Sequence, residues 1–512
     1  MNPNLGTILE KQATAQPTAD GLIGEDGRTL SFAEADLLAG GIAVALRAAG
    51  VGAGDRIAAY VKNGPELALL LFGAWKIGAI PVTISSLYNA HELAESVTKT
   101  EPVLLLVDDA KPEVVAAVRE MVPVLTFTGD LAGVRALEWR SGAALPAVTV
   151  GADDEACILF TGGTSGRPKA VSVTHGGVRD SLARLARVST GSEDGAAASQ
   201  SAPNLIALPL FHSGGQHSML FALHVGRGCV VWDRFSLDRL QTLLTRHRFD
   251  NLFLLPTMLF DIVHADQELP LESVKSVLVA GQALSWPVRK AFEERYRVPI
   301  LVNYGSTESG HIAGWTGRDM RAGAWKPGSA GKVYPGVEIE IRDDNGVAQP
   351  IGTAGEIVVR SAMTRGYVDD PDASAELVKD GWVHTGDIGY LDDDLVLFLS
   401  GRKRDMIKCG GFQVWPEEIE DELRNHPLVH DIRVVGTPDD RLGEIPTAIV
   451  VRESDDAVSD DDARELIVAY ARERLAHFKT PRRIEFVAEL ERSEAGKIKR
   501  GAVPELTGGA GA

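Results

Sequence analysis

The chain has 512 residues, which is room for about three domains of roughly 150 residues each. Its 52 lysines and arginines are outnumbered by 71 aspartates and glutamates, and the net charge of −19 excludes broad binding to nucleic acid or to an acidic membrane surface. With 45% hydrophobic and 24% charged residues, the composition is that of an ordinary globular protein and excludes disorder for the bulk of the chain.

Cysteine usage and the N-terminus bear on the compartment. Cys157, Cys229 and Cys409 are far apart and form no CxxC pair, so we expect neither a disulfide framework nor a zinc site. The N-terminus has no basic region followed by an apolar stretch, and the most apolar run, residues 67–75, ends at Lys76. We therefore expect a cytoplasmic protein without a membrane anchor.

The first half of the chain alternates between helix and strand patterns. Ser31 and Glu34 have the spacing of a capping box, which predicts a helix that runs to Gly50. Short apolar runs at residues 56–61 and 103–107 predict strands, and residues 66–75 have a helical pattern. This alternation predicts βα units around a largely parallel sheet, and hence the α/β class.

After Tyr390 the pattern changes. Three aspartates at 392–394 precede an apolar strand and the basic run at 401–405, where we place a domain boundary. Beyond it we expect a helix at residues 416–425 and strands at 432–435 and 447–451. Ser459 with three following aspartates is typical of a helix N-cap and its first turn.

One segment has the composition of a phosphate-binding loop. Residues 159–169 place three glycines, three hydroxyl side chains and Lys169 directly after an apolar strand. Glycine lets backbone N–H groups approach an anion, while hydroxyls and lysine add donors and charge. The spacing is neither GxxxxGK[ST] nor GxGxxG, which disfavours P-loop and Rossmann proteins, and alone the segment also fits a flexible surface turn.

Four further motifs follow in order, at residues 303–310, 384–390, 401–408 and 493–498. Together the five motifs resemble those of the adenylate-forming superfamily, which contains acyl-CoA synthetases, the adenylation domains of nonribosomal peptide synthetases and firefly luciferase. The resemblance extends from the helix near Ser31 to Lys497. It implies a large N-terminal adenylate-forming lobe of α/β subdomains at residues 1–403, a hinge at Arg404, and a small mobile α+β domain at residues 405–512.

The implied activity is that of an AMP-forming acid–thiol ligase with ATP, Mg²⁺ and coenzyme A. A carboxylate attacks the α-phosphate of ATP to give an acyl-adenylate, and a thiol then displaces AMP. Preorganised donors and cations are the main catalytic resource for the first step, because charge gathers on phosphoryl oxygens. By resemblance, the ATP and AMP ligands are Thr161, Gly162, Gly163, Thr164, Ser165, Gly166, Lys169, Gly281, Gln282, Ala283, Asn303, Tyr304, Gly305, Ser306, Thr307, Asp387, Arg402 and Lys497.

Individual roles also come from the resemblance. Tyr304 would stack on adenine, Thr307 would touch the α-phosphate, and Glu308 would bind Mg²⁺ through its carboxylate. Asp387 and Arg402 would bind the ribose. Lys497 would stabilise the adenylation transition state, after which rotation about Arg404 would bring a CoA-binding segment to the site: Lys408, Gly410, Gly411 and Phe412.

The acid is less constrained by the sequence. By resemblance the acyl pocket is lined by His212, Ser213, Gly214, Gly215, Gly305, Gly310, His311 and Ile312, and so many small residues would leave room for a bulky hydrophobic acid. His212 follows Phe211 where amino-acid-activating relatives have an aspartate, which disfavours α-amino acids because a buried ammonium needs a carboxylate. Cys409 is not expected to be a nucleophile, since a lone cysteine has no partner histidine within reach by sequence.

Three alternatives remain at this point. The acyl group could pass to a separate carrier protein or to a downstream acyl-accepting enzyme instead of CoA. The chain could be a luciferase-like oxygenase, or a non-catalytic nucleotide-binding protein, although Glu308, Asp387 and Lys497 are all present. One departure from many relatives is the turn before residue 396, where Asp394 and Leu395 lack the usual glycine, and we expect this turn to be built differently.

Overall fold

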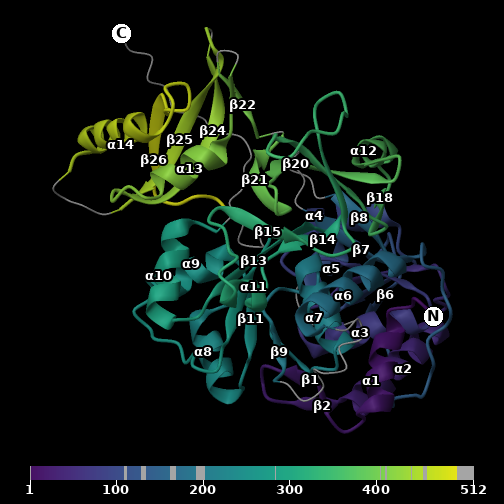
Figure 1. The fold of residues 1–512 in the computed structure, drawn as a ribbon. Helices are drawn as coiled ribbons and strands as arrows, with labels where there is room; N and C mark the ends of the chain where they lie inside the picture. Colours follow the sequence, from purple (N-terminus) through teal and green to yellow (C-terminus); the bar gives the residue numbers. More distant parts are fainter. Residues whose placement is uncertain are drawn as a thin grey trace.

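The computed structural model describes residues 2–108, 112–128, 134–161, 169–191, 202–282, 284–403, 405–409, 412–439, 441–453 and 458–492. It consists of a large N-terminal lobe and a smaller C-terminal domain, which lies at the upper left of Figure 1. The α/β class predicted from the sequence, with a large lobe and a small domain, is confirmed.

The first sheet begins as a parallel sheet, as predicted. Its parallel strands all run in one direction and place their carboxyl ends at one edge, which is where ligands of open α/β sheets bind. In spatial order they are β13 (Ile300–Ser306), β12 (Ser276–Val279), β11 (Asn251–Leu254), β9 (Asn204–Ile206), β10 (Cys229–Val231) and β1 (Asp20–Gly24), with β2 (Thr29–Ser31) antiparallel at the edge.

The same sheet continues beyond β13 in a form that the sequence pattern did not predict. Beyond β13 the paired strands of this sheet are antiparallel, and three of the pairs are hairpins instead of being joined by helical crossovers. The antiparallel part contains β14 (Gly310–Gly314), β15 (Ser329–Val333), β21 (Val396–Arg402), β20 (Trp382–Leu391), β17 (Gly355–Arg360) and β16 (Glu338–Arg342), with β19 (Val378–Lys379) beside β20. Strand β13 therefore belongs to both parts.

A second sheet carries the glycine-rich segment. Five of its strands are parallel, while β8 and β18 add two antiparallel strands at one edge. The order is β18 (Thr364–Tyr367), β8 (Lys169–Thr174), β7 (Glu155–Thr161), β4 (Ile80–Thr83), β3 (Arg56–Tyr60), β5 (Leu104–Val107) and β6 (Val124–Thr126).

Helices fill the space between the two sheets and cover their outer faces (Figure 1). The central layer is α1 (Gly6–Ala15), α2 (Phe32–Ala48), α3 (Pro65–Lys76), α6 (His175–Thr190) and α7 (Ser213–His224). Outside the first sheet lie α8 (Leu237–Arg246), α9 (Pro256–His264) and α10 (Trp286–Tyr296), and outside the second lie α4 (Ala90–Thr100) and α5 (Pro112–Ala116). Two shorter helices are α11 (Gly317–Arg321) and α12 (Pro371–Leu377).

The predicted local signals are confirmed. Ser31 accepts a hydrogen bond from the N–H of Glu34, whose carboxylate accepts in return from the N–H of Ser31, so α2 begins with the expected capping box. In the C-terminal domain Ser459 caps α14 (Asp460–Arg474) in the same way, through the N–H of Asp462.

The C-terminal domain has its own sheet and core. Strands β23 (Phe412–Val414), β22 (Ile407–Cys409), β25 (Gly443–Arg452) and β24 (Val429–Asp439) are antiparallel, and β26 (Arg483–Val487) pairs in parallel with β25. Helices α13 (Pro416–Leu423) and α14 pack on this sheet. The chain leaves the large sheet after Arg402 and enters the small one at Ile407, while the bounds predicted at 403 and 405 stay predictions and Arg404 lies outside the described residues.

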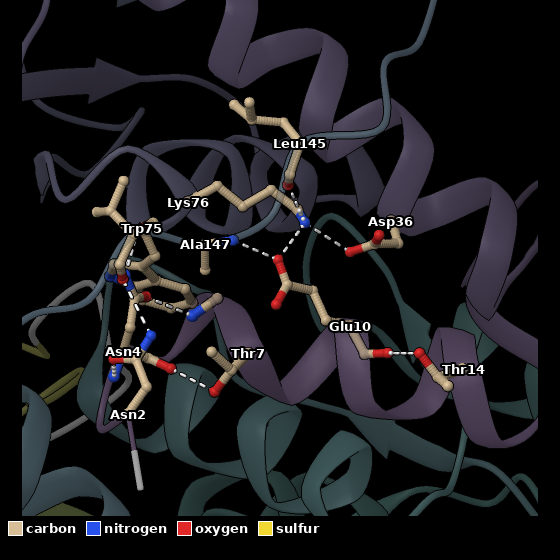
Figure 2. Close-up of polar contacts among 12 residues, drawn as sticks. Asn2, Asn4, Thr7, Glu10, Thr14, Asp36, Trp75, Lys76, Leu145 and Ala147 are labelled. Carbon is tan, nitrogen blue, oxygen red and sulfur yellow. Dashed lines mark hydrogen bonds and ion pairs between the residues drawn. The ribbon is translucent and has the colours of Figure 1, made fainter.

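A buried lysine ties the helical layer together. The Lys76 ammonium lies 2.7 Å from Glu10 Oε1 of α1 and 2.9 Å from Asp36 Oδ1 of α2, and it donates to the Leu145 carbonyl at 2.8 Å (Figure 2). Glu10 also accepts from the N–H of Ala147 at 2.6 Å (Figure 2). Burial raises the pKa of Asp36 from its ordinary value, although Lys76 acts in the opposite direction.

The turn between β20 and β21 is built without glycine, as expected from its sequence. Leu395 adopts a left-handed conformation with φ of 56°. Asp392 holds the turn, because its Oδ1 accepts from the N–H groups of Asp394 and Val396, both at 3.0 Å. Lys326 bridges the carboxylates of Asp392 and Asp394 at 2.6 and 2.7 Å.

All three cysteines are free and buried. Burial raises the pKa of the Cys157 thiol to about 12 and that of Cys229 further. Among the helices that the structure describes, none combines the length and apolar character needed to cross a bilayer.

Candidate active site

Four of the predicted nucleotide residues lie at the carboxyl end of β13, which pairs in parallel with β12. Strand β13 carries Asn303, Tyr304, Gly305 and Ser306 and forms a hairpin with β14, in which Gly305 pairs with His311. The hydroxyls of Ser306 and Ser309 each accept from the N–H of the other residue, at 3.1 and 3.2 Å. These bonds fix the tip of the hairpin, which presents Thr307 and Glu308.

Three predicted ligands form one polar chain. The Tyr304 hydroxyl donates to Asp387 Oδ2 at 2.7 Å, and Asp387 Oδ1 lies 3.1 Å from Arg402 Nε. The pairing of β20 with β21 places Asp387 directly opposite Arg402. Burial and the neighbouring Asp387 carboxylate raise the pKa of Tyr304 well above its ordinary value, so the phenol remains a hydrogen-bond donor. Each Asp387 oxygen keeps a lone pair with which a ribose hydroxyl could bond.

The lysine of the glycine-rich segment lies near the predicted metal ligand. Thr161 and Lys169 pair across β7 and β8, on either side of the segment 162–168. The Lys169 ammonium lies 4.5 Å from the centre of the Tyr367 ring, and the Tyr367 hydroxyl donates to Glu308 Oε1 at 3.4 Å. Tyr367 thus joins Lys169 to Glu308, so the strand β18 and the hairpin tip meet here.

The predicted acyl-pocket residues lie on this hairpin and at the start of α7. His212 is the N-cap residue of α7, and the Ser213 hydroxyl lies 2.8 Å from that of Thr307. Asn303 Oδ1 lies 3.1 Å from His311 Nδ1. Two of the glycines do not leave empty space, because a Cβ at Gly215 would lie 2.1 Å from the Pro209 carbonyl oxygen and one at Gly305 would lie 2.2 Å from that of Gly310. These glycines permit close backbone packing, so the argument for a wide pocket from small residues fails at both positions.

Other predicted residues are placed only in part. Gly281, with φ of 91°, and Gln282 follow β12, the strand next to β13. Lys408 lies on β22, where its N–H donates to Glu444 Oε2 at 2.8 Å, and the half-exposed Phe412 stacks on Phe478 at 4.3 Å. The predicted residues outside the described part are Gly162, Gly163, Thr164, Ser165, Gly166, Ala283, Arg404, Gly410, Gly411 and Lys497.

Sequence reasoning missed several polar side chains near this site. Tyr367 follows Gly366 in a region without a recognised motif, and its only local signal was an aromatic residue at the end of a short strand. No sequence signal distinguishes three other positions from ordinary helix positions, namely Ser181 and Arg184 of α6 and His217 of α7. Their association with the site depends on how α6 and α7 pack, which no local pattern reports.

Comparison with known proteins gives the family. The family described as AMP-binding enzyme matches residues 9–368, and the AMP-binding enzyme C-terminal domain matches residues 418–497. The chain belongs to the AMP-binding enzyme family. This confirms the resemblance inferred from the five motifs.

Among its relatives, 4-coumarate–CoA ligase 5 of Oryza sativa subsp. japonica is 30% identical over 96% of this chain and 92% of its own length. The long-chain-fatty-acid–CoA ligase FadD13 of Mycobacterium tuberculosis is 28% identical over 98% of both chains. The solved o-succinylbenzoate CoA synthetase of Bacillus subtilis, in complex with an acyl-adenylate, is 28% identical with a TM-score of 0.82 over 96% of both chains.

This member of the AMP-binding enzyme family is an acyl-CoA ligase of the AMP-forming, acid–thiol type, as expected from the sequence. The comparisons give no support to a carrier protein as the acyl acceptor. The three relatives are named for different acids, so the bulky hydrophobic acid expected from the sequence stays a prediction.

Proposed function

We propose that the ligase activates a carboxylic acid with ATP at the β13–β14 hairpin and transfers the acyl group to CoA. The observation that carries the proposal is the chain from Tyr304 to Asp387 to Arg402, which adjoins the hairpin tip with Thr307 and Glu308. A carboxylate paired with a fixed guanidinium suits a ribose diol, and the Thr307 hydroxyl at the tip could donate to a phosphate.

The first step forms a bond between a carboxylate oxygen of the acid and the α-phosphorus of ATP, and pyrophosphate leaves. We assign Lys169 and the hydroxyls of Thr161 and Thr307 to the phosphates, where they would offset the negative charge that develops. In the second step the CoA sulfur attacks the acyl carbonyl carbon, AMP leaves, and the thiol proton goes to solvent. We assign Lys408 and Phe412 to the CoA side of the site, as the resemblance implies.

The residues present suit Mg²⁺, although the described residues contain no cluster of three metal-binding side chains. Mg²⁺ keeps several waters and is often held by one or two carboxylates together with substrate phosphates, so Glu308 alone is sufficient from the protein. The metal would neutralise phosphate charge when bound. We retain the cytoplasm as the predicted location.

Two single substitutions test the site. Asp387→Ala should raise the KM for ATP by about 10-fold or more, because hydrogen bonds to a charged group contribute roughly 1.5–3 kcal/mol each. Glu308→Gln should slow pyrophosphate release and raise the Mg²⁺ concentration needed for half-maximal rate. Glu338→Gln is the control, since Glu338 pairs with Arg360 at 2.9 Å on the edge strand β16 and should have no kinetic effect. Pyrophosphate release at the unmodified rate in both site variants would contradict the assignment.

A further inference from the structure

At the predicted acyl pocket, to which His311 belongs, α6, α7 and β14 bring together four polar side chains. They are Ser181 and Arg184 of α6, His217 of α7 and His311 of β14. The His217 and His311 rings lie 5.5 Å apart, with their planes at 78°. A Cβ at Gly310 would lie 3.4 Å from Ser181 Oγ, which places that hydroxyl next to β14.

Three of these side chains contain buried polar atoms that lack a hydrogen-bond partner within the described part of the chain. The atoms are Ser181 Oγ, Arg184 Nε and His217 Nε2. Ser181 is fully buried and His217 is 8% exposed. Since most buried polar atoms in proteins are satisfied, three orphans in one place indicate a missing partner.

The hydrogen bonds that are present define what this partner must offer. His217 Nδ1 donates to the Ser213 carbonyl at 3.2 Å, which leaves Nε2 as an acceptor. His311 Nδ1 donates in the same way to Asn303 Oδ1 at 3.1 Å, so its Nε2 is also an acceptor. Burial lowers the pKa of His217 to about 4 and that of His311 to about 3, and both rings are neutral near pH 7.

Arg184, in contrast to the two histidines, is a hydrogen-bond donor with a positive charge. Its buried Nε has no hydrogen-bond partner among the residues that the structure describes, and burial lowers its pKa against the opposing effect of Asp180. Arg184 lies one helical turn after Ser181 on α6, the helix that packs against β14, and burial, His217 and the Arg184 charge together lower the pKa of His311. The cluster therefore combines a cationic donor and a hydroxyl with two acceptors.

Two residues of the predicted site, Ser213 and Asn303, also contact the cluster. The carbonyl of Ser213 accepts from His217, while the hydroxyl of Ser213 contacts Thr307. Asn303, which accepts from His311, directly precedes Tyr304. An acid whose carboxylate lies near Thr307 would thus extend its other end toward the four side chains.

We propose that Ser181, Arg184, His217 and His311 bind an oxygen-bearing group at the far end of the acid, and that this group is a hydroxyl. A hydroxyl suits both the donors and the acceptors of the cluster. Its oxygen accepts from Arg184 or Ser181, and its hydrogen is donated to a histidine Nε2. A second carboxylate would pair with Arg184, but its oxygens would be repelled by the Nε2 lone pairs of the two histidines. The inference rests on the proposed function and replaces the hydrophobic acid expected from the sequence.

The test compares matched acids in a pyrophosphate-release assay. One series is hexanoic, 6-hydroxyhexanoic and adipic acid, and the other is 3-phenylpropionic, 3-(4-hydroxyphenyl)propionic and 3-(4-carboxyphenyl)propionic acid. In at least one series, kcat/KM for the hydroxylated acid should exceed that for the hydrocarbon acid by about 10-fold or more, since each 1.4 kcal/mol is a factor of ten. A preference for the dicarboxylic member would assign the subsite to an anion and would overturn the hydroxyl.

Variants connect the preference to the cluster. Arg184→Met and His217→Phe should each lower kcat/KM for the preferred hydroxylated acid about 10-fold more than they lower kcat/KM for the hydrocarbon acid. Arg187→Met is the matched control, because Arg187 is exposed on the same helix. His217→Gln, whose carboxamide can still accept, should retain most of the preference, and it serves where the phenylalanine variant does not fold.

The outcomes distinguish a failure of the proposed subsite from a failure of the proposed function. Equal or faster use of the hydrocarbon acids, with ratios unchanged in Arg184→Met, would overturn the subsite and leave the proposed function intact. No pyrophosphate release with any acid, from a protein that still binds AMP, would overturn the proposed function and this inference together.

Discussion

Leu395 is a β-turn residue in a conformation that glycine adopts freely and that costs most other residues about 1–2 kcal/mol. Its side chain is 54% exposed and contributes little packing. The three aspartates at 392–394 suggested an acidic segment at a boundary, yet Asp392 and Asp394 fold the turn and bind Lys326. The carboxylates therefore hold the chain in a shape for which glycine would otherwise be needed.

We predict that Leu395→Gly raises the free energy of unfolding of the large lobe by about 0.5–1 kcal/mol, after subtraction of the higher chain entropy of glycine. Urea unfolding followed by fluorescence measures the change. Leu399→Gly is the control, because Leu399 is 41% exposed in the extended strand β21 and glycine there should destabilise. A loss of stability in both variants would show that Leu395 is not strained.

At the scale of elements, the same lysine that ends the apolar run of α3 is the most buried cation of the helical layer. Residues 67–75 indicated only that the helix stops being apolar at Lys76. The structure shows that this lysine joins α3 to α1 and α2, with Glu10 and Asp36 as its partners (Figure 2). Removal of one member of a buried ion pair leaves the others uncompensated, which is costly.

We predict that Lys76→Met lowers the free energy of unfolding by about 3–5 kcal/mol, because Glu10 and Asp36 would lose their common counterion. Lys326→Met provides the comparison: its two ion pairs are exposed to solvent, so the loss should be clearly smaller than that of Lys76→Met. Denaturant midpoints of the two variants measure the difference. Similar small losses for both would mean that the buried network does not fasten α1 and α2 to α3.

Local signals in the sequence predicted many of the helices and strands. The features that the sequence did not predict depend on long-range packing. Capping residues at Ser31 and Ser459 and the apolar runs of β3 and β5 act over a few neighbours, so the sequence contains their whole cause. The antiparallel half beyond β13 was missed because apolar runs do not report whether a hairpin or a crossover joins them. Arg184 and His217 were missed because only the packing of α6 on α7 brings them to the hairpin.

At the scale of the whole molecule, the large lobe and the C-terminal domain contact each other through aromatic rings and through the packing of α13 on β21. Phe260 and His264 of α9 lie 5.1 and 5.4 Å from the ring of His430 on β24. These ring contacts are one part of the interface between the two domains. The rotation itself and its hinge at Arg404 remain predictions.

We predict that Lys497→Ala slows adenylation by about 10²–10³-fold, the effect of removing one preorganised donor, yet still makes thioester from a preformed acyl-adenylate and CoA. Arg404→Pro should do the converse, because a fixed φ hinders the rotation that admits the thiol. Separate assays of pyrophosphate release and of thioester formation measure the two steps. Equal losses of both steps in folded Lys497→Ala would show that one arrangement performs the whole reaction.

Because all three cysteines are buried, the native thiols should react little with thiol-directed labels. A thiol reacts as its thiolate, and burial disfavours that form in Cys157 and Cys229, while Cys409 is only 2% exposed. Two surface cysteines introduced at Lys290 of α10 and Glu465 of α14 could therefore receive a fluorophore pair without prior removal of the native thiols. Energy transfer between the two dyes would then follow the C-terminal domain in real time as ATP, acid and CoA are added.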